Sequence, residues 1–482
     1  MAKKSVKKNQ PIYKKKFGTQ DVTKTFIELP VINPKAAGID VGSRSFFVCV
    51  GQGVNDVREF GVFTCDLHEI ARYLTELNYN SVAMESTGFY WKQLFVLLQD
   101  YGLEVILVNA RHLKNVKGRK TDVVDSRWIQ LLHSLGLLSA SFQPDNFTEE
   151  LRTYSRHRQY LIQQSAQYVL KMNKNLTLMN LQLKPILRDI VGLTGRSIIE
   201  AILNNERDPQ KMAELAHPNC EHPKEDFIKA LEGNYRDEYL FELKQCYVTY
   251  QHFQKLLGEC DEKINALLQE AKEQKEAKQE AAKSNENAGT RRNSKYKPPK
   301  IIKYKNSPLP QLAEQVYNLS DGVELLNIPG INLNTILTLL SEVGLDLSKF
   351  PSAKHFCSWL GLAPNNKITG GKVISSHTDR KKNRLALAFR DAANVIEHSS
   401  KPIQLKAYFL RIAFKKSRLV AITATARKLA TIVWNMLSKK QQYNSNVSQE
   451  SQAFLRKKKV KTLQRIIEEF GIRPTEIIFA NT

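Results

Sequence analysis

The chain has 482 residues, which is too long for one ordinary domain and allows roughly three. Its 72 lysines and arginines against 48 aspartates and glutamates give a net charge of +24, which favours a nucleic acid or an anionic membrane surface as partner over acidic proteins in general. No apolar run approaches a membrane span, the N-terminus lacks a signal-peptide core and the six cysteines are scattered, so we expect a cytoplasmic protein without membrane segments or a disulfide framework.

Residues 1–35 are expected to be a basic disordered arm. Seven of the first sixteen residues are lysine and almost none are apolar, a composition typical of disordered tails. Such an arm can solubilise the protein or hold phosphates without sequence preference, and composition does not separate these roles.

Residues 36–150 show three early strand patterns with short connections, followed by alternating helix and strand patterns. This order predicts a mixed sheet with an antiparallel edge, as in ribonuclease-H-like α/β domains. The expected strands are 37–42, 46–50, 58–65, 81–85 and 104–109, and the expected helices are 67–78, 90–101 and 121–138.

Four acidic residues fall at the ends of these elements. Asp40 lies within an apolar strand, where an unpaired carboxylate costs several kcal/mol unless it has a partner, a metal or a raised pKa. Glu85 ends another strand, and Asp122 and Asp125 share one face of a helix capped by Thr121. The helix dipole alone could also explain the last two. Together the four predict a site for one or two divalent cations, Mg²⁺ or Mn²⁺, acting on a phosphodiester.

A basic run leads directly into the acidic helix. Positive charge beside an acidic metal site suits a polyanionic substrate. The run consists of Arg111, His112, Lys114, Lys117, Arg119 and Lys120.

Residues 151–283 indicate a helical coiled-coil region, either a helical hairpin or an oligomerisation stalk. Apolar residues recur at heptad spacing, which is typical of a packed helix seam. They are Ile162, Val169, Leu176 and Leu183 in one set and Phe253, Leu257, Cys260, Ile264 and Leu267 in the other. Residues 284–306 then indicate a basic disordered linker.

Residues 307–440 predict a mostly α-helical C-terminal domain, and residues 441–482 a helical tail. Pro329 and Gly330 between two helical patterns are compatible with a helix-hairpin-helix, whose amides can bind a DNA phosphate, or with an ordinary helix corner. Farther on, the loop Thr369-Gly-Gly-Lys372 allows backbone to approach a phosphate closely. A hydroxyl in this basic setting could attack a phosphodiester or only bind one.

These motifs resemble the DEDD transposases of bacterial insertion sequences, the bridge-RNA-guided recombinases. The resemblance covers about residues 36–155 and 322–400. It is carried by Gly-Ile-Asp40-Val-Gly, Met-Glu85-Ser-Thr-Gly, Val-Asn-Ala-Arg-His112, Lys120-Thr-Asp122-x-x-Asp125, Ile-Pro-Gly330, Gly-Leu-Ala-Pro364 and Thr-Gly-Gly-Lys372.

The resemblance implies that Asp40, Glu85, Asp122 and Asp125 bind Mg²⁺ in a RuvC-like domain. It also implies that a serine of the later loop attacks DNA to give a covalent phosphoserine, and that a structured RNA pairs with donor and target DNA. The position aligned with that serine is Thr369, whose extra methyl group restricts χ1. Either Thr369 serves, or Ser375 or Ser376 does, or strand transfer is impaired; we favour Thr369.

The leading hypothesis is therefore a DNA transposase that uses Mg²⁺-dependent cleavage and strand exchange through a covalent hydroxyl–DNA intermediate. We expect donor and target DNA, a structured guide RNA and further copies of the chain, as a dimer or tetramer, as partners. The expected location is the bacterial cytoplasm, at the nucleoid during action. The alternatives are a metal-dependent nuclease of the Holliday-junction type without a covalent intermediate, a nucleic-acid-binding protein with decayed catalysis, and a sugar-kinase-like ATPase.

Overall fold

The structure is a computed structural model that describes residues 30–53, 55–109, 121–283, 299, 306–378, 383–400, 404–444 and 449–471. The chain divides into two compact units, Met1–Gln143 and Pro144–Thr482. The predicted basic arm and the basic linker lie mostly outside the described residues, and the basic run 111–120 lies wholly outside them.

The first unit is built on a five-stranded mixed sheet with strand order β3-β2-β1-β4-β5. β2 (Phe46–Cys49) pairs antiparallel with both β1 (Ala36–Val41) and β3 (Val57–Phe60). On the other side, β4 (Ser81–Glu85) and β5 (Glu104–Val108) continue parallel to β1. A mixed sheet with an antiparallel edge confirms the predicted α/β class.

Helices cover both faces of this sheet. α1 (Thr64–Glu76) and α2 (Trp91–Asp100) share a buried core with strand residues such as Ile39. α4 (Asp122–Ser134) packs on β1 from the opposite face, where Ile129 lies in a smaller cluster. Because side chains alternate along a strand, Asp40 lies on the face that α4 covers.

The predicted third strand, 58–65, is wrong beyond Phe60. Helix α1 begins at Thr64, so Cys65 is helical. The Asp66 carboxylate accepts a hydrogen bond from the Phe63 backbone amide at 3.0 Å, which stabilises the first turn of the helix. This local cap overrides the β-branched and aromatic residues that favour a strand.

The second unit begins with two long antiparallel helices, α5 (Asn146–Leu178) and α10 (Asp237–Lys283), which pack along their length. The buried Arg158 guanidinium donates to Asp261, and Gln254 donates to Ser165 at 2.8 Å. The predicted helical hairpin is therefore present within one chain. Whether it also joins copies of the chain stays a prediction.

The predicted seam of this hairpin is correct in part on each helix. On α10, Leu257, Cys260 and Ile264 are buried as expected, whereas Leu268 is buried in place of Leu267. On α5, Leu176 is buried as expected, Leu161 is buried in place of Ile162, and Leu183 lies beyond the end of the helix. The shift arises because Arg158 and Ser165, which a hydrophobic pattern skips, are buried against polar partners on α10.

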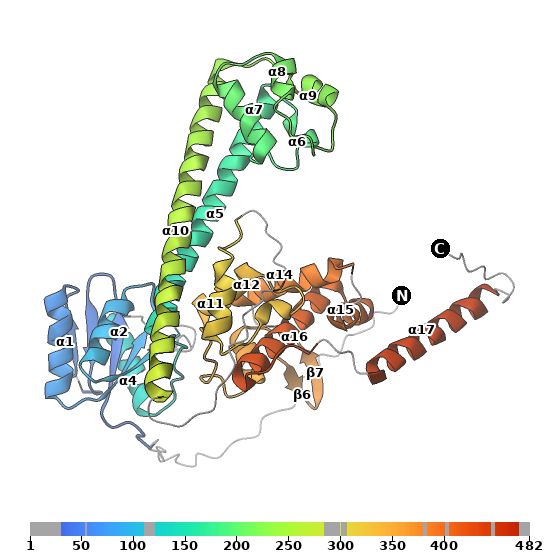
Figure 1. Ribbon diagram of the computed structural model, residues 1–482. Coiled ribbons are helices and arrows are strands. Elements are labelled where there is room, and N and C mark those ends of the chain that lie inside the picture. The colour runs from blue at the N-terminus through green and yellow to red at the C-terminus, as the bar shows by residue number, and fades with distance from the viewer. Residues whose placement is uncertain are drawn as a thin grey trace, which may run out of the picture. The chain divides into compact units, whose positions relative to one another are not determined.

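Four short helices form a head at the tip of the hairpin (Figure 1). They have their own core, which also includes residues of α5 from Met172 onward and residues of α10 up to Tyr250. The helices are α6 (Leu183–Ile186), α7 (Leu193–Leu203), α8 (Pro209–Ala213) and α9 (Lys224–Leu231).

The rest of the second unit is helical apart from one small hairpin. Its elements are α11 (Gln311–Leu319), the 3-10 turn Leu325–Asn327, α12 (Leu333–Glu342), α13 (Ala353–Trp359), β6 (Lys367–Thr369), β7 (Lys372–Ser375), α14 (Arg384–His398), α15 (Gln404–Lys415), α16 (Arg418–Lys439) and α17 (Gln449–Phe470). None of the helices in the described ranges is long and apolar enough to cross a membrane.

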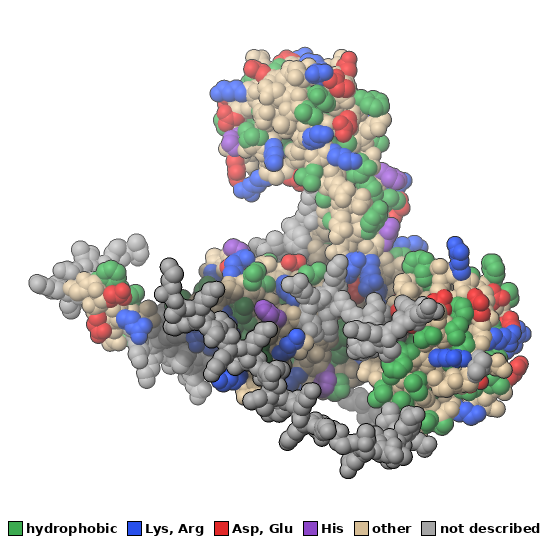
Figure 2. Space-filling model, turned by 180° about the vertical axis from the view of Figure 1, so that it is seen from behind, with side chains coloured by type: hydrophobic (Ala, Val, Ile, Leu, Met, Phe, Trp, Pro, Cys, Tyr) green, Lys and Arg blue, Asp and Glu red, His purple; other side chains and the backbone are tan. Residues whose placement is uncertain are grey.

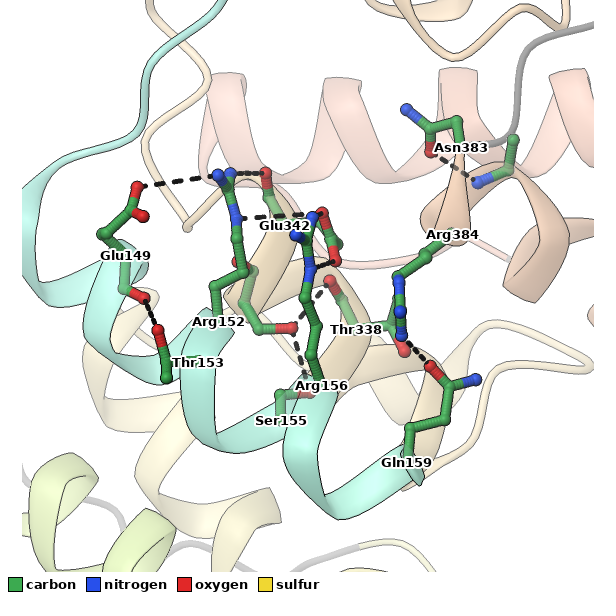
Figure 3. A network of polar contacts seen from close by, with 12 residues as sticks. Glu149, Arg152, Thr153, Ser155, Arg156, Gln159, Thr338, Glu342, Asn383 and Arg384 are labelled. Atoms are coloured by element: carbon green, nitrogen blue, oxygen red, sulfur yellow. Dashed lines mark hydrogen bonds and ion pairs between the residues drawn. The ribbon is translucent and has the colours of Figure 1, made fainter. Parts of the chain in front are cut away.

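The base of α5 is tied to α12 by arginine contacts (Figure 3). The Arg156 guanidinium makes two hydrogen bonds to the Glu342 carboxylate, at 3.0 and 2.8 Å. Arg152 donates to the backbone carbonyls of Ser341 and Glu342, the last residues of α12. Arg384, in the first turn of α14, reaches the Gln159 side chain. The contacts join the hairpin to the helical C-terminal part of the unit.

At the Pro329-Gly330 turn the structure supports the ordinary helix corner. Gly330 has φ +83°, and a Cβ there would lie 2.5 Å from the Ala392 carbonyl, so the turn is packed against α14. Asn332 caps α12 by accepting from the Thr335 amide at 3.0 Å, and Leu333 is buried. The N-terminus of α12 is thus engaged by protein.

Candidate active site

One pocket of the first unit is lined by all four predicted acids, Asp40, Glu85, Asp122 and Asp125. Its volume is about 420 Å³. The first two come from strands β1 and β4, and the other two from the first turn of α4. The structure therefore brings together side chains that lie up to 85 positions apart in the chain, from 40 to 125.

Strand pairing and a helix cap set the positions of these acids. Ile39 pairs with Met84 in the parallel β1–β4 register, so Asp40 and Glu85 follow at the same edge of the sheet. The Thr121 hydroxyl accepts from the Val124 amide at 3.3 Å and so begins α4 where predicted. Glu85 also accepts a hydrogen bond from the Thr87 hydroxyl at 2.9 Å.

Gly38 allows α4 to approach β1 closely. A Cβ on Gly38 would lie 2.3 Å from the Gln130 backbone nitrogen and 2.7 Å from the Ser126 carbonyl oxygen. Since backbone cannot yield as a flexible side chain does, only glycine fits at this position. The Gln130 side-chain amide donates to the Ala36 backbone carbonyl at 3.1 Å and so joins the helix to the strand.

We expect Gly38→Ala to push α4 away from β1. Overpacking of this kind lowers the free energy of unfolding by about 1–3 kcal/mol, and it should also displace Asp122 and Asp125, the two acids on α4. The matched control is Gly258→Ala on α10, where a Cβ meets no atom within 4 Å. That change should be neutral or stabilise by up to about 1 kcal/mol. Urea unfolding measures both variants, hydrogen exchange of the α4 amides locates the loss, and equal stability would contradict the close approach.

The carboxyl group of Asp40 has a raised pKa. The pKa of its carboxyl is raised from 3.8 to about 6, mainly by burial and, in decreasing order, by the negative charges of Glu85, Asp122 and Asp125. A hydrogen bond from the Val41 backbone opposes this increase. An ionised Asp40 is therefore unfavourable unless positive charge enters the pocket.

A pH dependence of stability follows from the raised pKa of Asp40. Between pH 3.8 and about 6 the folded chain keeps a proton that the unfolded chain releases, so in a chelating buffer this carboxyl destabilises the fold progressively as pH rises through that range. We expect Asp40→Asn to match the wild type in stability near pH 4 and to exceed it at pH 7. Thermal unfolding of both proteins across this range checks the difference. A gap that is constant with pH would contradict it.

The carboxylates form the donor set of a hard divalent cation. Within the described ranges, however, no group of three or more histidine, cysteine, aspartate or glutamate side chains is arranged to hold a metal ion. The four acids share the pocket without meeting at a common coordination point. Their chemistry fits Mg²⁺, and their carboxylates would have to come closer together to ligate it jointly.

Two further lining residues were not predicted as part of the site. Arg44, in the turn between β1 and β2, is an exposed cation in the pocket lining, and Thr87 supports Glu85. Proximity in sequence to Asp40 and Glu85 was the available signal for both. An arginine beside four acids offers a contact for a phosphate oxygen.

Thr369 lies in the second unit, at the tip of the β6–β7 hairpin. It pairs with Lys372 across Gly370 and Gly371, whose φ angles of +55° and +74° match a two-residue hairpin turn. A Cβ on either glycine would meet no atom within 4 Å. The Thr369 hydroxyl is thus exposed, beside a lysine on the same face of the hairpin.

The two alternative hydroxyls lie at the other end of this hairpin. Ser375 is half-buried and pairs with Lys367, and Ser376 follows β7 as an exposed residue. The basic residues that follow them in sequence, Arg380, Lys381 and Lys382, lie outside the described residues.

Two family models match the chain. Residues 37–181 match a model described as a transposase, the DEDD transposase of IS110. Residues 323–409 match a second, described as the transposase IS116/IS110/IS902 family. A segment of 113 residues is 29% identical to the insertion element IS110 uncharacterized 43.6 kDa protein of Streptomyces coelicolor, and it covers 23% of this chain and 28% of that protein. The four acids lie in the first matched region and Thr369 in the second, while residues 182–322 lie in neither.

Proposed function

Since the chain belongs to the IS110 family of DEDD transposases, we propose that it moves an insertion sequence by cutting and rejoining DNA. The observation that carries this proposal is the pocket in which Asp40, Glu85, Asp122 and Asp125 surround one space. Clustered carboxylates with a neighbouring arginine suit a substrate that brings both phosphate and divalent cations.

The four acids are proposed to hold Mg²⁺ or Mn²⁺. When bound, such a cation polarises a phosphodiester oxygen and offsets the charge that develops in the transition state. The raised pKa of Asp40 supports this assignment, because crowded carboxylates ionise together only when positive charge lies among them. We propose that Arg44, which also lines the pocket, orients the phosphate.

Thr369 is proposed as the nucleophile. Its hydroxyl oxygen would form a bond to phosphorus while the bond to one DNA oxygen breaks, and that oxygen would leave as a hydroxyl with the proton. The exposed hairpin tip and the paired Lys372 support Thr369 over the half-buried Ser375. The product of this step is a phosphothreonyl–DNA adduct.

The proposed partners are donor and target DNA, a structured guide RNA and further copies of the chain, as a dimer or tetramer. The net charge of +24 supports polyanionic partners. The proposed location is the bacterial cytoplasm, at the nucleoid during transposition.

The second candidate is a metal-dependent nuclease that cuts Holliday-type junctions without a covalent intermediate. It is favoured by one observation, that the acidic pocket is complete within the first unit. Hydrolysis by this pocket would not require Thr369.

A recombination assay with copurified nucleic acid tests the proposal. Nucleic acid that copurifies with the protein is sequenced, and plasmids carrying the ends and target of the associated element are incubated with the complex and Mg²⁺. We expect a structured RNA encoded by the element and joined recombinant products. Cut but unjoined DNA, with no bound RNA, would favour the nuclease.

A further inference from the structure

The corner between α15 and α16 exposes apolar side chains that nothing in the described part of the chain covers. Phe414 is 92% exposed, more than any other large hydrophobic side chain among the described residues, and Leu419 is 75% exposed. Leu410 lies four residues before Phe414 on the same face of α15 and is also exposed. The corner lies just beyond residue 409, where the second family match ends.

The inner side of the corner is packed. Leu405 and Phe409 of α15 are buried, and Phe409 packs in a core with Ala421 and Ile422 of α16. Only two residues separate the helices, and the Lys416 amide donates to the Ile412 carbonyl at 2.9 Å. Phe414 therefore projects from helices that are packed against each other.

The charged side chains of α15 and α16 are all cationic. No aspartate or glutamate occurs between Glu397 and Glu450, a stretch that contains both helices. Arg418 pairs with Glu397 at 2.7 Å. In the described part of the chain, Arg411, Lys415 and Lys416 have no carboxylate partner.

The head of the hairpin provides a contrast. On the face shown in Figure 2, its acidic and basic side chains are interspersed. Mixed charge gives no strong field, whereas the α15–α16 corner combines an apolar projection with positive charge of one sign.

We propose that the α15–α16 corner is a DNA contact in which Phe414 and Leu419 insert between stacked base pairs while Arg411, Lys415 and Lys416 hold the flanking phosphates. Apolar wedges of this kind unstack a base step and bend the duplex, and neighbouring cations bind its backbone. This inference rests on the proposed function in one respect, which is that the polyanion bound at the corner is DNA. It assigns to the second unit a DNA-deforming surface separate from the acidic pocket and from Thr369.

The test measures unstacking without cleavage. The wild-type chain and the Phe414→Ala/Leu419→Ala variant are added, in a chelating buffer, to DNA duplexes that carry 2-aminopurine at successive positions. The wild type should raise the fluorescence at a step that the wedge enters, and the variant should lose this rise and bind about tenfold more weakly. The Lys415→Gln/Lys416→Gln variant should keep the rise at low salt while the slope of log affinity against log salt falls by about 2.

Phe241→Ala is the matched control, because Phe241 is an exposed phenylalanine on α10. It should behave as the wild type, and circular dichroism should show all variants folded. An unchanged fluorescence rise in the Phe414→Ala/Leu419→Ala variant would overturn the proposal. So would self-association without DNA, or binding to vesicles of anionic phospholipid, that depends on Phe414. Because no cleavage is measured, failure of the wedge is distinguishable from failure of the proposed catalysis, which Asp40→Asn tests.

Discussion

Asp40→Asn is expected to lower Mg²⁺-dependent DNA cleavage by about a thousandfold or more, because loss of a metal-binding carboxylate removes several kcal/mol of transition-state stabilisation. Asparagine has nearly the same size as aspartate, but it lacks the carboxyl group whose pKa is raised in the pocket. DNA binding through the basic surfaces should change little. The measurements are cleavage of the element ends and filter binding of the same DNA.

Asp100→Asn is the matched control for the Asp40 substitution. Asp100 ends α2 in the same unit, is exposed and does not line the pocket. It removes the same charge from the chain and should leave cleavage within about twofold of the wild type, as expected for a surface substitution. Equal activity of both variants would refute the assignment of the pocket as the catalytic centre.

Thr369→Ala is expected to abolish the covalent protein–DNA adduct and to lower strand exchange by at least about a thousandfold, the scale seen when a catalytic nucleophile is removed. DNA trapped on the denatured protein is measured by gel electrophoresis. Thr369→Ser should preserve or increase the adduct, because serine keeps the hydroxyl and lacks the methyl group that restricts χ1.

Ser376→Ala separates the alternative nucleophiles. Ser376 is exposed on the same hairpin segment, so its loss tests a hydroxyl in a comparable setting. We expect the adduct to persist in this variant. Cleavage that survives in Thr369→Ala without any adduct in the wild type would instead support the nuclease.

The acidic half of the site was predictable because its signals are local. Asp40 and Glu85 end apolar strands, and parallel pairing places the ends of neighbouring strands at one edge. Thr121 is the N-cap of α4, which begins at the next residue. These features depend on alternation and capping, which the sequence displays directly.

Long-range polar burial was not predictable. Arg158 is only 3% exposed although arginine favours the surface, and it is buried because Asp261, 103 positions away, pairs with it. The closeness of α4 to Gly38 likewise depends on two elements that meet only in the folded chain. Phe414 is the opposite case. A phenylalanine in an amphipathic helix is expected to be buried in the core, but Phe414 is exposed. In each case the burial or exposure of the residue depends on whether a partner from a distant part of the described chain packs against it.

Because the hairpin is antiparallel, its head can be treated as a separate module in protein engineering. α5 runs from the base of the hairpin to the head, and α10 runs back to the base. Removing the head therefore leaves the separation between the two helices at the base unchanged. A deletion that joins the helices beside the Ser165–Gln254 hydrogen bond would remove the whole head core, which begins at Met172 and ends at Tyr250. The arginine contacts of α5 with α12 lie on the retained side of this cut. The head could therefore be deleted or exchanged while the four acids and the second matched region stay unchanged, although this cut removes residues 166–181, the end of the first matched region.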